Sequence, residues 1–398
     1  GGMNAPFAPD ARAADKVTRV DLHNAGEARR ITAFVEEQGG SPFHLPSWLN
    51  AVERGAGQKA CGLLAERAGR ITGWLPLTIL RSPLFGRALI SSGFAVDGGI
   101  LSSDPDSEAR LAHAAGELAE RLCCEEVELR GGTVPSGWDA VTGKHSGFVC
   151  DLAEDDEAQL LAIPRKQRAE VRKSLQGELH VTVGADEPDR AAHYACYAAS
   201  VHNLGTPVFP RSLFDAVLDG FGERADILTV WDGDAPLASV LTLYHQGIAY
   251  PFWGGGVWRA RATRANERMY YALMCHARGE KACTRFDFGR SKTGSGPWNY
   301  KKTGGFAPEP ITYARWSAPG AAPRSRACTS RRRCRRPARP PRRRPGRRGD
   351  GNLGATPRRA RDRRERVRRA AARHDPGLRC HGGDRPGQRG RSRSLRAH

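Results

Sequence analysis

The chain has 398 residues and a formal net charge of +20, a balance typical of proteins that bind nucleic acids or anionic surfaces. The charge is confined to one end. Residues 317–398 hold 28 arginines, no lysine and five acids, a net charge of +23, whereas residues 1–316 hold 35 basic and 38 acidic side chains, a net charge of −3. The larger part therefore has no overall field that attracts polyanions, and any phosphate binding there must be local.

The segment Ser317–His398 contains no Ile, Phe, Tyr or Trp. It cannot bury enough apolar surface to offset the entropy of ordering, about 1–2 kcal/mol per residue, so we expect disorder. One interpretation is that this segment is an Arg-rich arm that binds RNA, DNA or another anionic polymer. The other interpretation is that it is the end of a G+C-rich gene translated out of frame. The lack of lysine favours the second, because residues 1–316 use nine Lys against 26 Arg.

Residues 1–316 contain seven cysteines with no CxxC pair and no His, Asp or Glu cluster at metal-ligand spacing, so we expect reduced thiols and no metal site. No basic-then-apolar leader and no run of 18 apolar residues is present. These features predict a cytoplasmic protein without a transmembrane segment, and they are compatible with peripheral membrane contact.

Residues 1–16 are predicted to be disordered, and the elements that follow alternate between helix and strand. The Gly-rich segment Gly93–Gly99 precedes a helix with 3.6-residue apolar spacing. The expected elements of the first half are a helix opening at Phe43–Leu49, strands at Gly62–Glu66 and Ile71–Leu80, a helix at Ser107–Leu122 and a strand at Val127–Leu129.

A basic helical connector, Asp155–Leu175, broken at Ile163-Pro164, leads to a second half with the same order of elements. The expected elements there are strands at Asp226–Trp231, Pro236–Tyr244 and Ile248–Trp253, a helix at Glu267–Arg278 and a strand at Thr284–Phe288. The repeated order indicates two related α/β units. The alternative is that the halves are unrelated and that any two α/β segments resemble each other this much.

Several motifs are more specific, and they occur in a fixed order: Ile163–Arg168, Asn203–Pro207, Trp253–Gly256, Arg285–Lys292, Tyr300–Lys302 and Gly305-Phe306. In this order they resemble the FemAB-type transferases. More narrowly, they look like the branch associated with exosortase/PEP-CTERM systems. The resemblance covers about Phe43 to Tyr313 and ends where the Arg-rich segment begins.

The resemblance implies an α/β fold of two tandem GNAT-like domains with mixed sheets. We place the first at residues 17–152 and the second, with the basic connector helix, at residues 153–316. The resemblance also implies acyl-CoA or aminoacyl-tRNA as donor substrate, with no tightly bound cofactor. The acceptor would be an amine on a cell-envelope or exopolysaccharide precursor.

Acyl transfer to an amine requires alignment of the two substrates, removal of a proton and stabilisation of an oxyanion. The sequence contains no nucleophile elbow of the GxSxG kind, which favours direct transfer. Lys301 and Lys302 follow a loop rich in Gly and Ser, and a cationic amine there suits an oxyanion or a phosphate. In the family pattern an aromatic–Lys pair occupies this place, which maps to Tyr300-Lys301. The alternative is two solvated surface lysines.

Arg290 and Lys292 lie beyond the strand Thr284–Phe288, where ligand-facing residues of open α/β sheets commonly lie. They suit a phosphate or carboxylate, or they are merely solvated. Asp287 alternates with Phe286 and Phe288, so its side chain is expected on the opposite face of the strand. It is a candidate general base, and the alternative is a structural carboxylate.

The remaining candidates are weaker. Gly254, Gly255 and Gly256 would let a cofactor approach the backbone, or they mark a bulge at a strand end. Trp253 would line a pocket, or it belongs to the core. Arg165, Lys166 and Arg168 would grip an anionic acceptor, or they form a solvated helix face.

Two functions of other classes remain open at this point. One is a nucleic-acid- or polyanion-binding protein that acts through the Arg-rich segment. The other is a GNAT-like scaffold without turnover.

Overall fold

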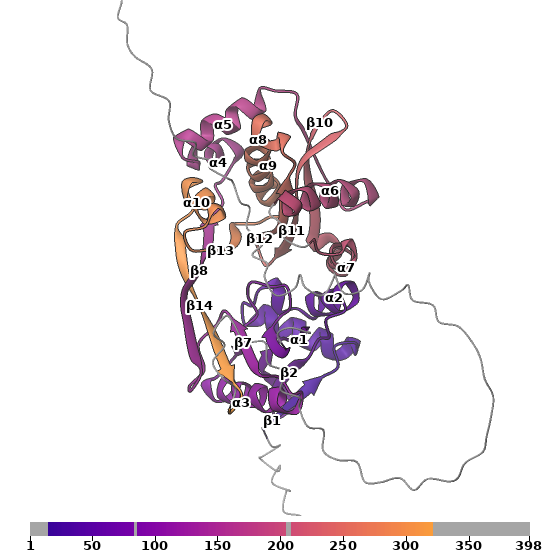
Figure 1. Cartoon of the computed structure of the whole chain (residues 1–398), viewed down its shortest axis with the longest axis vertical. Coiled ribbons are helices and arrows are strands. Elements are labelled where there is room, and N and C mark those ends of the chain that lie inside the picture. The colour runs from indigo at the N-terminus through magenta and orange to yellow at the C-terminus, as the bar shows by residue number, and fades with distance from the viewer. Residues whose placement is uncertain (1–14, 83–85, 204–207, 321–398) are drawn as a thin grey trace, which may run out of the picture.

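The computed structural model describes residues 15–82, 86–203 and 208–320 (Figure 1). Most of the Asn203–Pro207 motif, the first 14 residues and the Arg-rich segment beyond Gly320 lie outside these ranges, so the predictions made for them are not addressed by the structure.

The first half begins with a strand and two helices, followed by a run of short strands. Its elements are β1 (Lys16–Val20), α1 (Ala25–Glu37), η1 (Pro42–His44), α2 (Pro46–Ala56), β2 (Gly62–Arg67), β3 (Arg70–Leu75), β4 (Leu77–Ser82), β5 (Gly86–Ser91), β6 (Leu101–Ser102), α3 (Pro105–Arg121), β7 (Glu126–Arg130) and β8 (Asp139–Asp151).

The second half begins at the basic connector, where α4 ends at Ala162 and α5 begins at Arg165, as the predicted break at Ile163-Pro164 requires. Its elements are α4 (Asp156–Ala162), α5 (Arg165–Leu175), β9 (His180–Gly184), α6 (Glu187–Asn203), α7 (Arg211–Phe221), η2 (Gly222–Arg224), β10 (Ala225–Asp232), β11 (Ala235–His245), β12 (Ile248–Gly256), α8 (Arg259–Thr263), α9 (Ala265–Gly279), β13 (Arg285–Lys292), α10 (Gly296–Thr303) and β14 (Pro308–Ser317).

The strands form a four-stranded sheet, β1-β2-β3-β6, and a ten-stranded sheet, β4-β5-β7-β14-β8-β13-β12-β11-β10-β9. The predicted single strand Ile71–Leu80 is wrong in detail, because Pro76 divides it into β3 and β4, which belong to different sheets. Proline has no N–H to donate to a ladder, so it marks the point where the chain leaves one sheet for the other. The strand β5 was not expected from the sequence.

The two halves share one motif, in which a helix joins two parallel strands. In the first half α3 lies between β5 and β7, and in the second α9 lies between β12 and β13; each strand pair is parallel. The order of elements predicted for both halves is therefore present, and the predicted α/β fold with mixed sheets is confirmed.

Two long strands connect the halves (Figure 1). β8 pairs with β13 through Phe286↔Cys150, and β14 is inserted between β7 and β8 through Trp316↔Val127 and Pro308↔Phe148. This strand, the last that the structure describes, thus completes the sheet of the first half. The boundary predicted near residue 152 remains a prediction.

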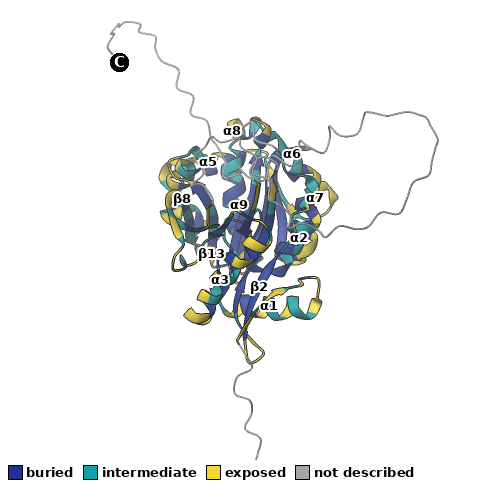
Figure 2. Ribbon diagram, turned by 60° about the horizontal axis from the view of Figure 1, so that its bottom comes forward, coloured by how far each residue is buried: buried dark blue, intermediate teal, exposed yellow. Residues whose placement is uncertain are grey.

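Helices α2 and α7 join the halves on another side. Gly55 allows the approach, because a Cβ there would lie 2.6 Å from the Leu213 Cα. Above this contact the indoles of Trp48 and Trp253 stack with ring centroids 5.6 Å apart, both in the buried core. Figure 2 shows this buried interior surrounded by helices whose outer faces are exposed. The two halves are packed together through one shared aromatic core.

Candidate functional site

An opening forms where the parallel strands β12 and β13 separate. Their pairing covers Ile248↔Arg285 and Ala249↔Phe286; beyond these pairs β12 continues on β11, while β13 continues on β8. Ligands of open α/β sheets bind at the carboxyl ends of parallel strands. A cavity of about 20 Å³ lies there, with Phe288, Arg290 and Lys301 among the lining residues. That volume is enough for roughly one water molecule.

The equivalent position in the first half is filled by the chain itself. After β5, the segment Ser92–Gly99 folds over β7, and Arg130 Nη1 donates to the Ala95 carbonyl oxygen at 2.9 Å. A Cβ on Gly99 would lie 2.1 Å from the Gly131 carbonyl oxygen. The backbone of the first half is therefore in direct contact where the second half has its opening.

Lys301 is a buried lysine on α10, with 4% of its surface exposed. Its Nζ donates to the carbonyl oxygen of Phe288 at 2.8 Å and to that of Arg290 at 3.3 Å. The same ammonium group lies 5.1 Å from the centroid of the Phe288 ring and 5.4 Å from that of Phe148. Carbonyl oxygens and ring faces both stabilise a cation. Lys301 follows the Gly- and Ser-rich loop as expected, and the structure places it on a helix, α10, that Ser295 caps.

Asp287 lies on β13 between the buried rings of Phe286 and Phe288, with its own side chain partly exposed on the other face, as predicted. Its Oδ1 accepts a hydrogen bond from the Gly289 N–H at 2.9 Å. The pKa of this carboxyl group is raised to about 6, mainly by loss of hydration and also by nearby Asp97, while the Gly289 N–H and Lys301 act in the opposite direction. A carboxylate that titrates near neutral pH is suited to general base catalysis.

A β-bulge sets the direction of this part of the strand. The register with β8 shifts between Asp287 and Arg290, and Gly289 has φ of +71°. Glycine adopts this left-handed region without the steric cost that a Cβ would bring. Bulges of this kind turn side chains away from the regular alternation of a strand, and here both Gly289 and Arg290 line the cavity.

Arg290 is buried, and its guanidinium lies 5.3 Å from the centroid of the Tyr313 ring. It also lies close to Glu128 of the first half. Burial favours the protonated form of Glu128, but Arg130, Arg290 and Arg315 together hold the pKa of that carboxyl group below its ordinary value. Arg290 is thus a fixed cation at the edge of the cavity, next to β14.

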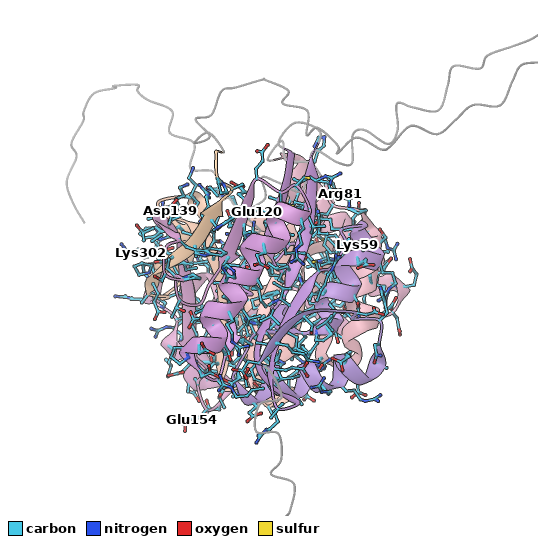
Figure 3. All side chains as sticks on the ribbon, turned by 90° about the horizontal axis from the view of Figure 1, so that it is seen from below. Lys59, Arg81, Glu120, Asp139, Glu154 and Lys302 are labelled. Atoms are coloured by element: carbon cyan, nitrogen blue, oxygen red, sulfur yellow. The ribbon has the colours of Figure 1, made fainter. Side chains whose placement is uncertain are left out.

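Three predicted residues lie around α10 rather than in the cavity lining. Lys292 is exposed at the end of β13, and the Tyr300 ring, half-buried, lies 6.2 Å from that of Tyr270. Lys302 lies at the edge of the molecule (Figure 3), with its Nζ 5.0 Å from the centroid of the Trp298 ring. Of the two predicted lysines, Lys301 is the one that reaches the cavity.

The basic side chains Arg165, Lys166 and Arg168 lie on the first turn of α5. A Cβ on Gly305 would lie 2.9 Å from Pro164 Cδ, so the start of α5 is next to the end of α10. Arg165 and Lys166 are exposed, and Arg168 Nε donates to the Ile163 carbonyl oxygen at 3.1 Å. These cations are neighbours of the candidate site on the surface, and they do not line its cavity.

The glycine run Gly254–Gly256 belongs to β12, where all three residues pair with β11. Close packing explains the glycines. A Cβ on Gly255 would lie 2.8 Å from Ser200 Cβ, and one on Gly256 would lie 2.8 Å from Ala260 Cβ. Trp253 has 1% of its surface exposed and stacks on Trp48, which gives it a packing role in the core. Gly254 lines the cavity.

Asp97 of the first half was missed by the sequence interpretation. It lies in the segment Ser92–Gly99, whose residues Ser92 and Phe94 have φ of 49° and 60°. Burial, followed by the fields of Asp287 and Asp97, raises the pKa of Tyr250, which places the three groups in one region. An acidic residue inside a Gly-rich segment was the available signal. Strained backbone of this kind is typical of functional sites.

The comparisons with known proteins concern the fold and the second half of the chain. A family model described as an acetyltransferase (GNAT) domain matches residues 164–302, the part of the chain that contains α5, β12, β13 and Lys301. This part of the chain is therefore similar to a GNAT acetyltransferase domain. No curated protein matches the sequence.

Three solved structures share the fold. FemX is 15% identical, with a TM-score of 0.57 over 75% of this chain and 96% of that chain. A tandem GNAT protein from the clavulanic acid biosynthesis pathway is 12% identical, with a TM-score of 0.51 over 78% and 100% of the two chains. The C-terminal domain of a putative lysylphosphatidylglycerol synthetase from Agrobacterium fabrum is 15% identical, with a TM-score of 0.50 over 73% and 92%. The fold is a tandem GNAT fold.

Two further observations concern the described ranges alone. Within residues 15–82, 86–203 and 208–320, no helix is both long and apolar enough to span a bilayer. In the same ranges, no three His, Cys, Asp or Glu side chains gather as a metal site would require.

Proposed function

We propose that the protein transfers an acyl or aminoacyl group directly from a carrier to an amine of a cell-envelope or exopolysaccharide precursor in the cytoplasm. The observation that carries the proposal is the buried amine of Lys301 in the cavity between β12 and β13, bonded to the carbonyl oxygen of Phe288, the neighbour of Asp287 along β13. A cation and a carboxylate with a pKa near neutrality are the two groups that this reaction needs from a protein.

In the proposed reaction the amine nitrogen of the acceptor attacks the carbonyl carbon of the donor. The new C–N bond forms, the bond from the carbonyl carbon to the carrier sulfur or oxygen breaks, and the carrier leaves with the electron pair of that bond. Asp287 accepts the proton that the attacking amine loses, and the leaving carrier atom takes up a proton. Lys301 and Arg290 stabilise negative charge on the carbonyl oxygen or on a phosphate of the substrate.

For the donor we propose acyl-CoA or aminoacyl-tRNA. The GNAT domain model supports a thioester donor, and the shared fold with FemX keeps an aminoacyl ester in consideration. The basic side chains Arg165, Lys166 and Arg168 next to α10 suit the phosphates of a nucleotide carrier or of the acceptor. The glycines Gly254–Gly256 remain candidates for contact with a carrier.

For the acceptor, support comes from the order of motifs in the sequence, which resembles the exosortase/PEP-CTERM branch of the FemAB-type transferases. An exopolysaccharide or peptidoglycan precursor that bears a free amine is the substrate class this resemblance implies. Lys292 and Tyr300 lie at the rim of the site, where such an acceptor would enter.

The test is a transfer assay with radiolabelled acetyl-CoA and with charged tRNA, against amino sugars and precursor peptides as acceptors. We expect an amide product with one of the two donors, and its loss in Lys301→Met and Asp287→Asn. Isothermal titration would accompany the assay. If neither donor binds and no product forms, the chain is a GNAT-like scaffold and the proposal is wrong.

A further inference from the structure

Trp258 is the most exposed large hydrophobic residue among those the structure describes, with 78% of its surface accessible. It lies between β12 and α8 on a well-ordered turn. Val257 on one side donates its N–H to the Leu237 carbonyl oxygen at 2.9 Å and packs against the core, and Ala260 on the other donates its N–H to Val257 at 3.0 Å. These hydrogen bonds fix the backbone around Trp258, and the turn that they form directs the indole toward solvent.

The surroundings of Trp258 are strongly basic. We define the Trp258 surface as residues 165–175, which form α5, and residues 257–264, which contain α8. These two segments contain eight arginines and lysines and one acid, Glu170, although residues 1–316 as a whole are slightly acidic. The surface is therefore a local cation cluster on a body that would otherwise not attract anions.

The two segments of this surface lie side by side at one end of the molecule. Arg264 donates to the Glu170 carboxylate, and Arg268 Nη1 donates to the Ser174 carbonyl oxygen at 3.0 Å. Figures 1 and 2 both show α5 and α8 together at the same end. The exposed cations include Arg172 and Arg261. Glu170 is shared between Arg264 and Lys173, and Arg259 pairs with Asp232 outside the surface. The two segments themselves carry a net charge of +7.

Exposed aliphatic side chains lie at the two ends of α5. Leu161, at the end of α4, is 51% exposed, and Leu175, at the end of α5, is 41% exposed. The phosphates of a nucleic acid make no favourable contact with these leucines. A bilayer makes such contacts, because its interfacial region binds Trp rings at the headgroup level, attracts Lys and Arg, and accepts apolar side chains below them.

We propose that the Trp258 surface binds an anionic lipid bilayer, with the Trp258 indole inserted at the headgroup boundary and the cations of α5 and α8 on the lipid phosphates. The opening between β12 and β13 would then lie near the membrane, because Gly305 after α10 contacts Pro164 at the start of α5. This binding does not depend on the proposed transfer reaction.

The experiment uses the full chain and vesicles of phosphatidylglycerol and phosphatidylcholine that carry brominated acyl chains, which quench inserted tryptophans. The Arg-rich segment 317–398 contains no Trp, so its adsorption to the vesicles produces no such signal by itself. We expect quenching of the wild type, its loss in Trp258→Phe, and its retention in the control Trp316→Phe, which changes a residue of β14 that pairs with Val127 of β7 in the first half.

A charge-reversal pair gives a second readout. We expect Arg172→Glu with Arg261→Glu to weaken vesicle binding at least tenfold relative to the control pair Lys59→Glu with Arg81→Glu, two exposed cations of the first half (Figure 3). Equal quenching in Trp258→Phe and the wild type would overturn the proposal, and so would equal losses in the two pairs. A third result would also overturn the proposal, namely that Arg172→Glu with Arg261→Glu weakens the binding of bulk tRNA while vesicle binding stays unchanged. That result would assign the Trp258 surface to RNA binding.

Discussion

The ammonium group of Lys301 lies 2.8 Å from the carbonyl oxygen of Phe288, the residue next to Asp287 on the same strand. This contact fixes a positive charge beside a carboxylate that is itself poorly hydrated. The hydrogen bonds to the Phe288 and Arg290 carbonyl oxygens and the two nearby ring faces hold the Lys301 amine in place before any substrate arrives.

Replacing Lys301 by methionine keeps the length of the side chain and removes the charge. We expect turnover in the transfer assay to fall at least tenfold, which corresponds to about 1.4 kcal/mol of lost transition-state stabilisation. Circular dichroism would check that the fold is intact. The matched control is Lys302→Met, on the same helix but exposed, which should retain activity. Unchanged turnover in Lys301→Met would remove this lysine from the site.

The pH profile should report Asp287. A general base must be deprotonated, so kcat/KM is expected to rise with pH through the pKa of Asp287, about 6. The carboxylate of Asp97 raises that pKa, so Asp97→Asn should move the acid limb of the profile to lower pH. Steady-state kinetics across the pH range measures both. A limb that does not move in Asp97→Asn would show that Asp97 does not act on the base.

The ionised carboxylate of Asp287 should also lower the free energy of unfolding at neutral pH. Its pKa in the folded chain lies above the ordinary value for aspartate, so the folded state binds its proton more tightly than the unfolded state, and stability falls as pH rises between the two values. Asp287→Asn removes this cost and still accepts the Gly289 hydrogen bond. We expect it to raise Tm above pH about 6, with no gain below pH about 4. Thermal unfolding at both ends of the range tests this, and equal Tm differences at the two would contradict it.

The contact between α2 and α7 depends on Gly55. A Cβ there would lie 2.6 Å from both the Leu213 Cα and the Ser212 carbonyl oxygen, so Gly55→Ala must push the helices apart and should cost about 1–3 kcal/mol. Gly220→Ala is the control on α7, because its Cβ would meet Ser47 O at an ordinary 3.5 Å. It should be neutral or stabilise by up to about 1 kcal/mol through helix propensity. Urea unfolding would measure both changes, and equal effects would show that the helices are not in close contact.

Local patterns in the sequence predicted the order of helices and strands in both halves, because apolar spacing and turn residues are short-range signals. The same signals were present but missed at α10, where Ser295 and Pro297 form a regular helix start. Trp253 and the Gly254–Gly256 run left two interpretations open, a ligand site or close packing. The structure shows packing contacts from Trp48, Ser200 and Ala260, which no local pattern reveals, while Gly254 also lines the cavity.

The long-range part of the site had no sequence signal of its own. Asp97 and Asp287 are separated by nearly half of the chain, and the exchange of β14 into the first half brings together strands that no local pattern connects. Lys301 and Asp287 were found because their neighbours form recognisable motifs. The signal for Asp97, an acidic residue in the Gly-rich segment Gly93–Gly99, did not indicate that its partner would be Asp287.

The insertion of β14 between β7 and β8 also affects how the chain folds as it is made. Strands β7 and β8 leave the ribosome long before residues 308–317, so during synthesis their unpaired edges wait for a partner strand that is made much later. Pairing over such a sequence separation is slow, and open strand edges invite association between chains. The first half of this protein therefore completes its folding only after the second half has been made. A nascent chain that stops before β14 exposes two strand edges that are prone to aggregation.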